Sequence, residues 1–158
     1  MKLPWHLECD QSQTPTLFEL SDGRFQVVSH GQLAPLMGGY GYLLVEKRLA
    51  DFLASLKLER VSYEPVAFFF PFTGEEVRTH VRIRVSQFFT AQDLRGLALD
   101  GLRLMTMNDR YYFVSEELKG ELEQSGFAYL QFSEGLTGFG GSAAHTVRAT
   151  RPGVPGNT

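Results

Sequence analysis

The sequence predicts an α+β fold made of two similar strand–helix–strand halves around a mainly antiparallel sheet. One block of sequence occurs twice, over about residues 42–66 and 111–134, and matching positions are 69 residues apart. A second observation is the segment from Val77 to Val85, where apolar and polar residues alternate strictly, as in a strand with one buried and one polar face. Two copies of one element order, without a catalytic cluster, favour a binding scaffold over an enzyme.

The first copy begins with a strand at Tyr42–Val45 and continues into a helix over 46–57. Apolar residues follow the i, i+3, i+4, i+7 pattern of one buried stripe along this helix: Leu49, Phe52, Leu53 and Leu56. A strand over 59–66 completes the unit.

The second copy begins with Tyr111–Val114, and Ser115 is a suitable N-cap for the helix that follows. The acidic pair Glu116-Glu117 in the first turn favours the helix dipole, and Gly126 is a suitable stop. The apolar stripe is only Leu118 and Leu122, so this helix is expected to pack less deeply than the first.

The segments outside the repeat are assigned from turn residues and local patterns. An Asp22-Gly23 turn between two apolar runs predicts a hairpin. The remaining expectations are an irregular lead-in over 1–15, a loop over 29–39, a short helix beginning near Thr90 and a strand over 102–107. Residues 1–135 are predicted to form a single domain, and residues 136–158 a flexible tail rich in glycine and proline.

Composition limits the classes of function. The 158 residues suit one compact domain, and a net charge of −3 gives no general attraction to nucleic acid or to an anionic membrane. A single cysteine, Cys9, excludes an internal disulfide and fits the reducing cytosol, so a cytoplasmic location is expected. The sequence contains neither a stretch of membrane-spanning length nor the apolar run of a signal peptide.

Catalytic patterns are weak throughout. The four histidines are scattered and no cysteine pair exists, so no metal site is expected. Cys9 and His6 are close in sequence, but an incidental thiol is the simpler interpretation. The glycine-rich stretches lack phosphate-loop spacing, and adjacent carboxylates do not converge on one substrate atom. We therefore predict a non-enzymatic protein without catalytic residues, cofactor or metal.

The most distinctive surface feature is a row of basic residues on the alternating strand, next to an acidic turn and a run of phenylalanines. The candidate partner-binding residues are Arg78, His80, Arg82, Arg84, Glu75, Glu76, Phe70 and Phe72. The basic row could hold an acidic partner. The alternative is a solvated face whose arginines pair across strands with Glu59 or Glu64, and the phenylalanines are most simply core.

The second copy also carries a family resemblance. A strand ending in Val114-Ser115, an acidic helix from Glu116 to Lys119 and a Gly126-Phe127 exit resemble bacterial immunity proteins of polymorphic toxin systems, and the related Myxococcus double-CxxCG proteins. The likeness covers roughly residues 35–134 and consists of hydrophobic spacings; both CxxCG elements are absent, so no metal is carried over.

The resemblance implies a protein that binds and blocks one cognate toxin or effector without catalysis. Two other functions stay open, an adaptor or chaperone that loads a secreted effector and a small enzyme. An adaptor should bind the toxin without abolishing its toxicity, whereas an immunity protein should abolish it. An enzyme should show a polar pocket with convergent perturbed groups.

Overall fold

A computed structural model describes residues 2–139, which form three β-sheets, two α-helices and two short 3-10 helices. The α+β class and the mainly antiparallel pairing agree with the sequence prediction. The elements in chain order are β1 (Trp5–Glu8), β2 (Leu17–Glu19), β3 (Phe25–Val27), β4 (Leu36–Gly39), β5 (Tyr42–Glu46), α1 (Lys47–Ser55), β6 (Val61–Pro65), β7 (Phe68–Phe70), β8 (Glu75–Val77), β9 (His80–Val85), β10 (Phe88–Phe89), η1 (Ala91–Gly96), β11 (Leu104–Met107), β12 (Tyr111–Val114), α2 (Glu116–Gln124), β13 (Gln131–Glu134) and η2 (Thr137–Phe139).

Two of the sheets share one topology, which extends the predicted repeat. One has the order β4-β5-β9-β6, and the other, apart from its edge strand β10, has the order β11-β12-β1-β13. In each sheet a hairpin leads into a helix and then into a strand that runs parallel to the second hairpin strand. The fourth strand lies between these two parallel strands and is antiparallel to both. Both segments 42–66 and 111–134 are therefore strand–helix–strand units, as predicted.

Matching positions in the two halves have matching environments. Three pairs of apolar residues at the 69-residue spacing are almost fully buried: Val45 and Val114, Leu49 and Leu118, and Leu53 and Leu122. The backbone after each helix is left-handed at the same place, with φ of 54° at Lys57 and 85° at Gly126. The predicted helix stop at Gly126 is thus confirmed, and Lys57 adopts this conformation without being glycine.

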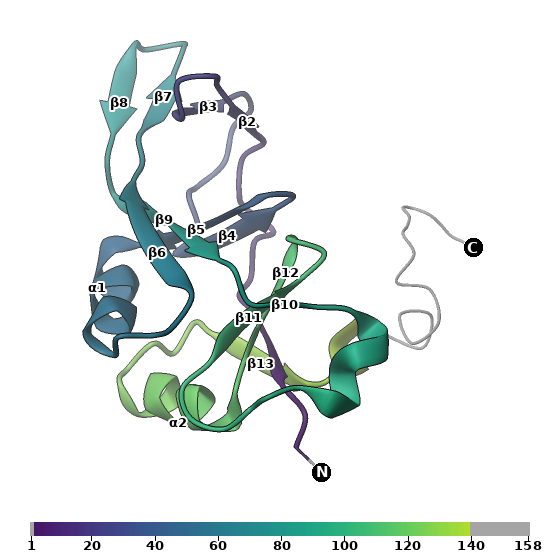
Figure 1. Ribbon diagram of the computed structural model, residues 1–158. Coiled ribbons are helices and arrows are strands. Elements are labelled where there is room, and N and C mark those ends of the chain that lie inside the picture. The colour runs from purple at the N-terminus through teal and green to yellow at the C-terminus, as the bar shows by residue number, and fades with distance from the viewer. Residues whose placement is uncertain (1, 140–158) are drawn as a thin grey trace.

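The middle strand comes from different places in the two halves. In the first half β9 follows β6, whereas in the second half β1 comes from the start of the chain and lies between β12 and β13 (Figure 1). The predicted irregular lead-in over 1–15 is therefore wrong for Trp5–Glu8. Four residues carry too little pattern to identify a strand, and the extended state is stabilised by pairing on both sides.

The alternating segment from Val77 to Val85 is two strands. Val77 ends β8 in the small sheet β2-β3-β7-β8, and His80 begins β9 in the first repeat sheet, so Arg78 and Thr79 connect two sheets. The alternation of buried and exposed side chains fails along β9, because α1 lies against one of its faces and the small sheet covers His80 and Arg82 on the other. The predicted loop over 29–39 also contains a strand, β4, paired with β5.

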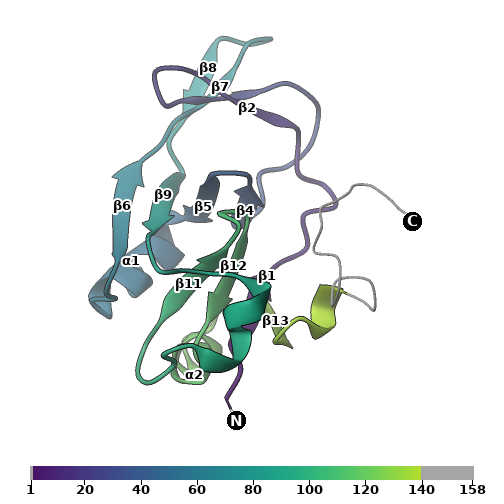
Figure 2. The ribbon, with the colours of Figure 1, turned by 45° about the vertical axis from the view of Figure 1, so that its right-hand side comes forward.

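The small sheet lies apart from the helices, at the opposite end of the molecule from α2 (Figures 1 and 2). Its first two strands are the hairpin predicted around Asp22-Gly23. Phe25 and Phe68 on its neighbouring inner strands β3 and β7 are fully buried, and Phe25 meets the Tyr42 ring with centroids 5.0 Å apart. The sheet is therefore anchored to the first half by aromatic packing.

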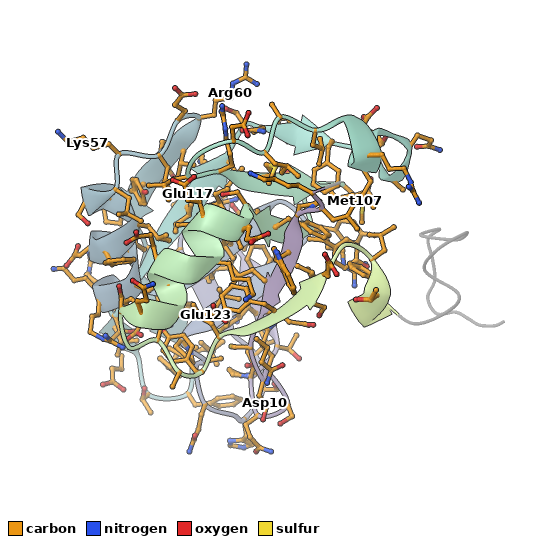
Figure 3. The ribbon with its side chains drawn as sticks, turned by 90° about the horizontal axis from the view of Figure 1, so that it is seen from below. Asp10, Lys57, Arg60, Met107, Glu117 and Glu123 are labelled. Carbon is orange, nitrogen blue, oxygen red and sulfur yellow. The ribbon has the colours of Figure 1, made fainter. Side chains whose placement is uncertain are left out.

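One core joins the two halves. α1 and α2 lie side by side (Figure 3), and the Phe52 and Phe127 ring centroids are 5.4 Å apart. On α1, Leu49 and Leu53 are buried, whereas Phe52 and Leu56 are half-buried, so the predicted stripe is only partly inside. The expectation that the second helix packs less deeply is wrong, because Leu118 and Leu122 are as buried as their counterparts.

A second, smaller core lies under η1 and η2. Its buried members include Phe89, Met105 and Phe113, and Leu136 and Phe139 pack against it. Residues 136–139 of the predicted tail therefore pack on the folded body, and residues 140–158 lie outside the described part of the chain. No helix in residues 2–139 has the length and apolar character needed to cross a membrane.

The core predicts the effect of shortening a repeat leucine. Leu53→Ala removes a side chain that is 3% exposed and should lower the free energy of unfolding by about 2–5 kcal/mol, because both transfer energy and a cavity contribute. Phe72→Ala is the control, since Phe72 is 84% exposed and its loss should change stability by less than about 0.5 kcal/mol. Urea unfolding measures both. A loss below about 1 kcal/mol for Leu53→Ala would contradict the core assignment.

The repeat topology also predicts a circular permutant. The Gly135 N–H donates to the Pro4 carbonyl at 2.8 Å, so the end of β13 lies beside the start of β1, just as β6 ends beside β9. A chain that runs from residue 13 to 139, then through a linker of about ten Gly/Ser residues, then through residues 2–12, should fold with the same circular dichroism and cooperative unfolding.

Deletion of residues 2–9 is the comparison for this permutant. It leaves β12 and β13 without the strand between them, so this variant should not unfold cooperatively. A permutant as disordered as the deletion variant would show that β1 depends on its connection to β2, and not only on its two neighbours.

Candidate partner-binding site

A charged cavity of about 530 Å³ lies between the β2–β3 turn and the strand pair β6–β9. Its charged lining comes from three parts of the chain that are far apart in sequence: Glu19, Asp22 and Arg24 from the first hairpin, Glu64 from β6, and Arg78, Arg82 and Arg84 from β9 and the residues before it. The cavity exists because the small sheet folds over the outer face of β9. Three of the predicted partner-binding arginines therefore meet in one place.

Arg82 is the most deeply held of these arginines, at 7% exposed. Its Nη1 donates to Glu19 at 2.6 Å, its Nη2 donates to the Gly41 carbonyl at 2.7 Å, and its guanidinium lies 5.7 Å from the centre of the Phe25 ring. The Gly41 N–H in turn donates to the Asp109 carbonyl in the hairpin of the second half. Arg82 therefore links the small sheet to the junction between the halves, and it forms an ion pair in which the arginine is buried and Glu19 is exposed.

The rim of the cavity is a network of more exposed pairs. Arg24 donates to Asp22 at 2.9 Å and to Glu76 at 2.8 Å, and Arg78 donates to the other oxygen of Glu76 at 3.0 Å. Hydrogen bonds from these arginines lower the pKa of Glu76, and the pKa of Asp22 is lowered chiefly by the backbone N–H of Arg24. These carboxylates are therefore ionised near neutral pH.

On the opposite rim, Arg84 donates from Nε to Glu64 at 2.8 Å, and this hydrogen bond lowers the pKa of Glu64. This pair is the cross-strand alternative expected from the sequence. The other expected acidic partner, Glu59, pairs instead with Arg103 at 3.2 Å. Both Arg84 and Glu64 are about half exposed, so solvent screens their attraction and either side chain can change partner at little cost.

The hairpin β7–β8 carries the predicted aromatic and acidic residues. Phe72 at its turn is 84% exposed, Phe70 is half-buried, and Glu75 and Glu76 are exposed. The turn is closed by Gly74, whose φ is 75° and whose N–H donates to the Phe70 carbonyl at 2.8 Å. An apolar ring is thus held on a defined turn beside the charged rim.

His80 does not belong to this surface. Its Nε2 is 2.8 Å from the Ala34 carbonyl, its ring meets Phe68 edge-on at 5.2 Å, and burial lowers its pKa. The prediction that His80 and Arg82 lie on a solvated cationic face is therefore wrong. Alternation indicates which side chains share a face, but it does not reveal that the small sheet covers that face.

Sequence reasoning missed Glu19 and Arg24 as members of the site. Both lie on the hairpin that the Asp22-Gly23 turn predicts, so the local structure was visible. The parallel pairing of β3 with β7 is what brings this hairpin over β9, and parallel contacts between distant segments leave no local pattern.

The Cys9 and His6 pair considered as a nucleophile is not assembled. The Cys9 thiol is buried, donates to the Leu36 carbonyl at 3.2 Å, and has its pKa raised by burial. His6 packs against the Phe113 and Phe139 rings at 5.0 and 4.6 Å. Within residues 2–139, no three His, Cys, Asp or Glu side chains are grouped so as to hold a metal ion.

Comparison with family models, with curated proteins and with solved structures gave no match to this chain. The site is therefore interpreted from its own chemistry. A rim of paired arginines and carboxylates can exchange partners with charged groups of another molecule, and an exposed ring beside it can fill an apolar pocket on that molecule.

The buried His6 predicts a loss of stability in acid. Burial lowers the pKa of His6 from 6.5 to about 4. In the unfolded chain His6 therefore becomes protonated below about pH 6.5, whereas in the folded chain it stays neutral down to about pH 4. Stability should fall as the pH falls through this window, by up to about 3 kcal/mol in total. Two other ionisable side chains lie close to His6: Glu8, whose Oε2 is 3.6 Å from His6 Nδ1, and Tyr111, whose ring centroid is 6.0 Å away.

His6→Leu should remove that part of the pH dependence, measured as urea unfolding at pH 7.0, 5.5 and 4.0. His30→Leu is the control, because His30 is exposed and its replacement should leave the profile unchanged. If His6→Leu and the wild type lose the same stability between pH 7 and 4, His6 is not the group responsible.

Proposed function

We propose that this chain is an immunity protein that binds one cognate bacterial toxin or effector in the cytoplasm and neutralises it by covering its active site. The resemblance carried by residues 108–132 motivates this class. A non-catalytic role is consistent with the described site, where the charged groups pair with one another and the candidate nucleophile is buried.

The observation that carries the proposal is the hairpin β7–β8 with Phe72 at its turn. A large ring that is 84% exposed contributes little to the chain's own fold but can contribute strongly to binding, because aromatic anchors are common among interface hot spots. Charged side chains surround it, with Glu75 and Glu76 on the same hairpin and Arg78 directly after it. An apolar centre within a polar rim is the usual anatomy of a protein interface.

Occlusion also suits the shape of this part of the molecule. The small sheet and its hairpin project from the repeat halves (Figures 1 and 2). A projecting hairpin can enter a concave active site and exclude substrate without any chemical step. A specific complex of ordinary size would bury about 800 Å² on each partner, in a patch of roughly 20–30 residues. The hairpin β7–β8 spans residues 68–77, so the rim of the charged cavity is expected to share the interface.

The test uses the protein encoded beside this chain in its native locus, with growth of a toxin-expressing strain and the dissociation constant as readouts. The wild type should restore growth. Phe72→Ser should weaken binding about tenfold or more, as expected for a central aromatic anchor. Phe88→Ser is the matched control, because Phe88 is 61% exposed but lies on β10 in the other half.

Three outcomes would contradict the proposal. Equal effects of the two substitutions would show that the hairpin is not the contact. A complex in which the toxin stays fully active would indicate an adaptor or chaperone. If the chain does not bind the protein encoded beside it, the proposal that it is an immunity protein for that protein is wrong.

A further inference from the structure

The charged cavity contains more hydrogen-bond donors than its own carboxylates use. Arg84 employs only Nε, toward Glu64, and Arg78 employs only Nη2, toward Glu76. Arg24 employs Nε and Nη1 and leaves Nη2 without a partner among the described residues. Five guanidinium nitrogens are therefore unpaired in residues 2–139, namely one on Arg24, two on Arg78 and two on Arg84.

The acceptors at the cavity are closer to saturation. Both oxygens of Asp22 accept hydrogen bonds from Arg24, and both oxygens of Glu76 accept hydrogen bonds from Arg24 and Arg78. Within the described chain, only one oxygen of Glu19 and one of Glu64 stay unused at this network. Among the described residues, five guanidinium nitrogens but only two carboxylate oxygens are thus without a partner at this network, so the cavity has more unused donor atoms than unused acceptor atoms.

We propose that the cavity binds carboxylate side chains from an acidic segment of the partner protein. This inference rests on the proposed function and deepens it, since it assigns the chemistry of one part of the interface. The two terminal nitrogens of Arg84 form the planar fork that accepts a carboxylate with two parallel hydrogen bonds. Arg78 and Arg24, on the facing rim, supply donors for a second carboxylate of the same segment.

The charge balance requires a ligand to exchange with the cavity's own carboxylates. The arginines of the cavity, Arg24, Arg78, Arg82 and Arg84, are matched by four carboxylates at or beside it, on Glu19, Asp22, Glu64 and Glu76. Because no positive charge is in surplus, an anionic ligand has to displace one of these carboxylates from its arginine. A ligand carboxylate can take the place of Glu64 on Arg84, and the exposed Glu64 can turn to solvent.

Arg82 keeps the floor of the cavity in place during this exchange. Its partners Glu19 and Gly41 hold two of its nitrogens, and its Nε is enclosed by protein, so it does not contact the ligand directly. The ligand therefore meets Arg84 on one rim and Arg24 with Arg78 on the other, over a fixed base.

The experiment titrates the full chain with a capped tetraglutamate peptide at low salt and follows the Nε–Hε NMR signals of the arginines. Capped tetraglutamine and inorganic phosphate are the comparison probes. Tetraglutamate should shift the Arg84 signal and bind about tenfold more tightly than either comparison probe. Arg84→Gln should weaken its binding about three- to fivefold, the effect expected for one exposed charged contact.

A second variant makes the test independent of folding. Glu64→Gln removes the carboxylate that competes with the peptide for Arg84, so peptide affinity should rise about three- to fivefold. Arg84→Gln should lower the affinity, and a damaged fold would not raise it. Arg48→Gln is the matched control, because Arg48 is also a half-exposed arginine beside a glutamate, Glu46, but lies outside the cavity. It should leave the affinity unchanged.

Several results would overturn the inference. Tetraglutamine binding as tightly as tetraglutamate would show that the carboxylates are not recognised, and phosphate binding more tightly than the peptide would make the cavity a phosphate site. Weaker peptide binding by Glu64→Gln would contradict the exchange. If the peptide does not bind while the chain still neutralises its toxin, this inference fails and the proposed function stands. If the peptide binds but the chain does not neutralise the toxin, the cavity assignment stands and the proposed function fails.

Discussion

The fold depends on one strand in each half that must pair on both of its sides. The helix in each unit connects two parallel strands that do not touch each other, and an antiparallel strand fills the space between them. Without that strand, two rows of backbone N–H and C=O groups would lose their partners inside the sheet. β9 satisfies this requirement in the first half and β1 satisfies it in the second, so β1 and β13, near the two ends of the described residues 2–139, belong to one sheet.

The difference between the halves lies in how the middle strand is connected. In the first half the chain passes from β6 to β9 through the hairpin β7–β8, whereas in the second half the equivalent connection is replaced by the two ends of the described chain, where Gly135 meets Pro4. The hairpin that carries Phe72 is therefore an insertion into the repeated unit. The proposed binding surface belongs to this insertion and to its paired hairpin β2–β3, while the repeat supplies the rigid support.

Local patterns were sufficient to predict the elements whose structure is determined locally. The buried positions Leu49 and Leu53 of the helix stripe, the cap at Ser115, the left-handed stop at Gly126 and the Asp22-Gly23 hairpin follow from short-range chemistry, and the structure confirms them. β1 and β4 were missed because each is only four residues long and is held by its neighbours rather than by its own composition. The break at Arg78-Thr79 was missed because the alternation continues across a change of sheet.

The site shows why a correct set of residue types can still be placed on the wrong surface. Alternation along the chain put Arg78, His80, Arg82 and Arg84 on one face, and three of them do line one cavity. The hairpin β2–β3, which is distant in sequence, covers part of this face and so determines which of these side chains are exposed to solvent. Arg82 lies under that cover and needs Glu19, whereas Arg84 lies beyond it and retains unused donors. Arg82 and Arg84 carry the same charge but differ in role. The buried Arg82 is hydrogen-bonded to protein groups in place of water, whereas the half-exposed Arg84 remains partly hydrated.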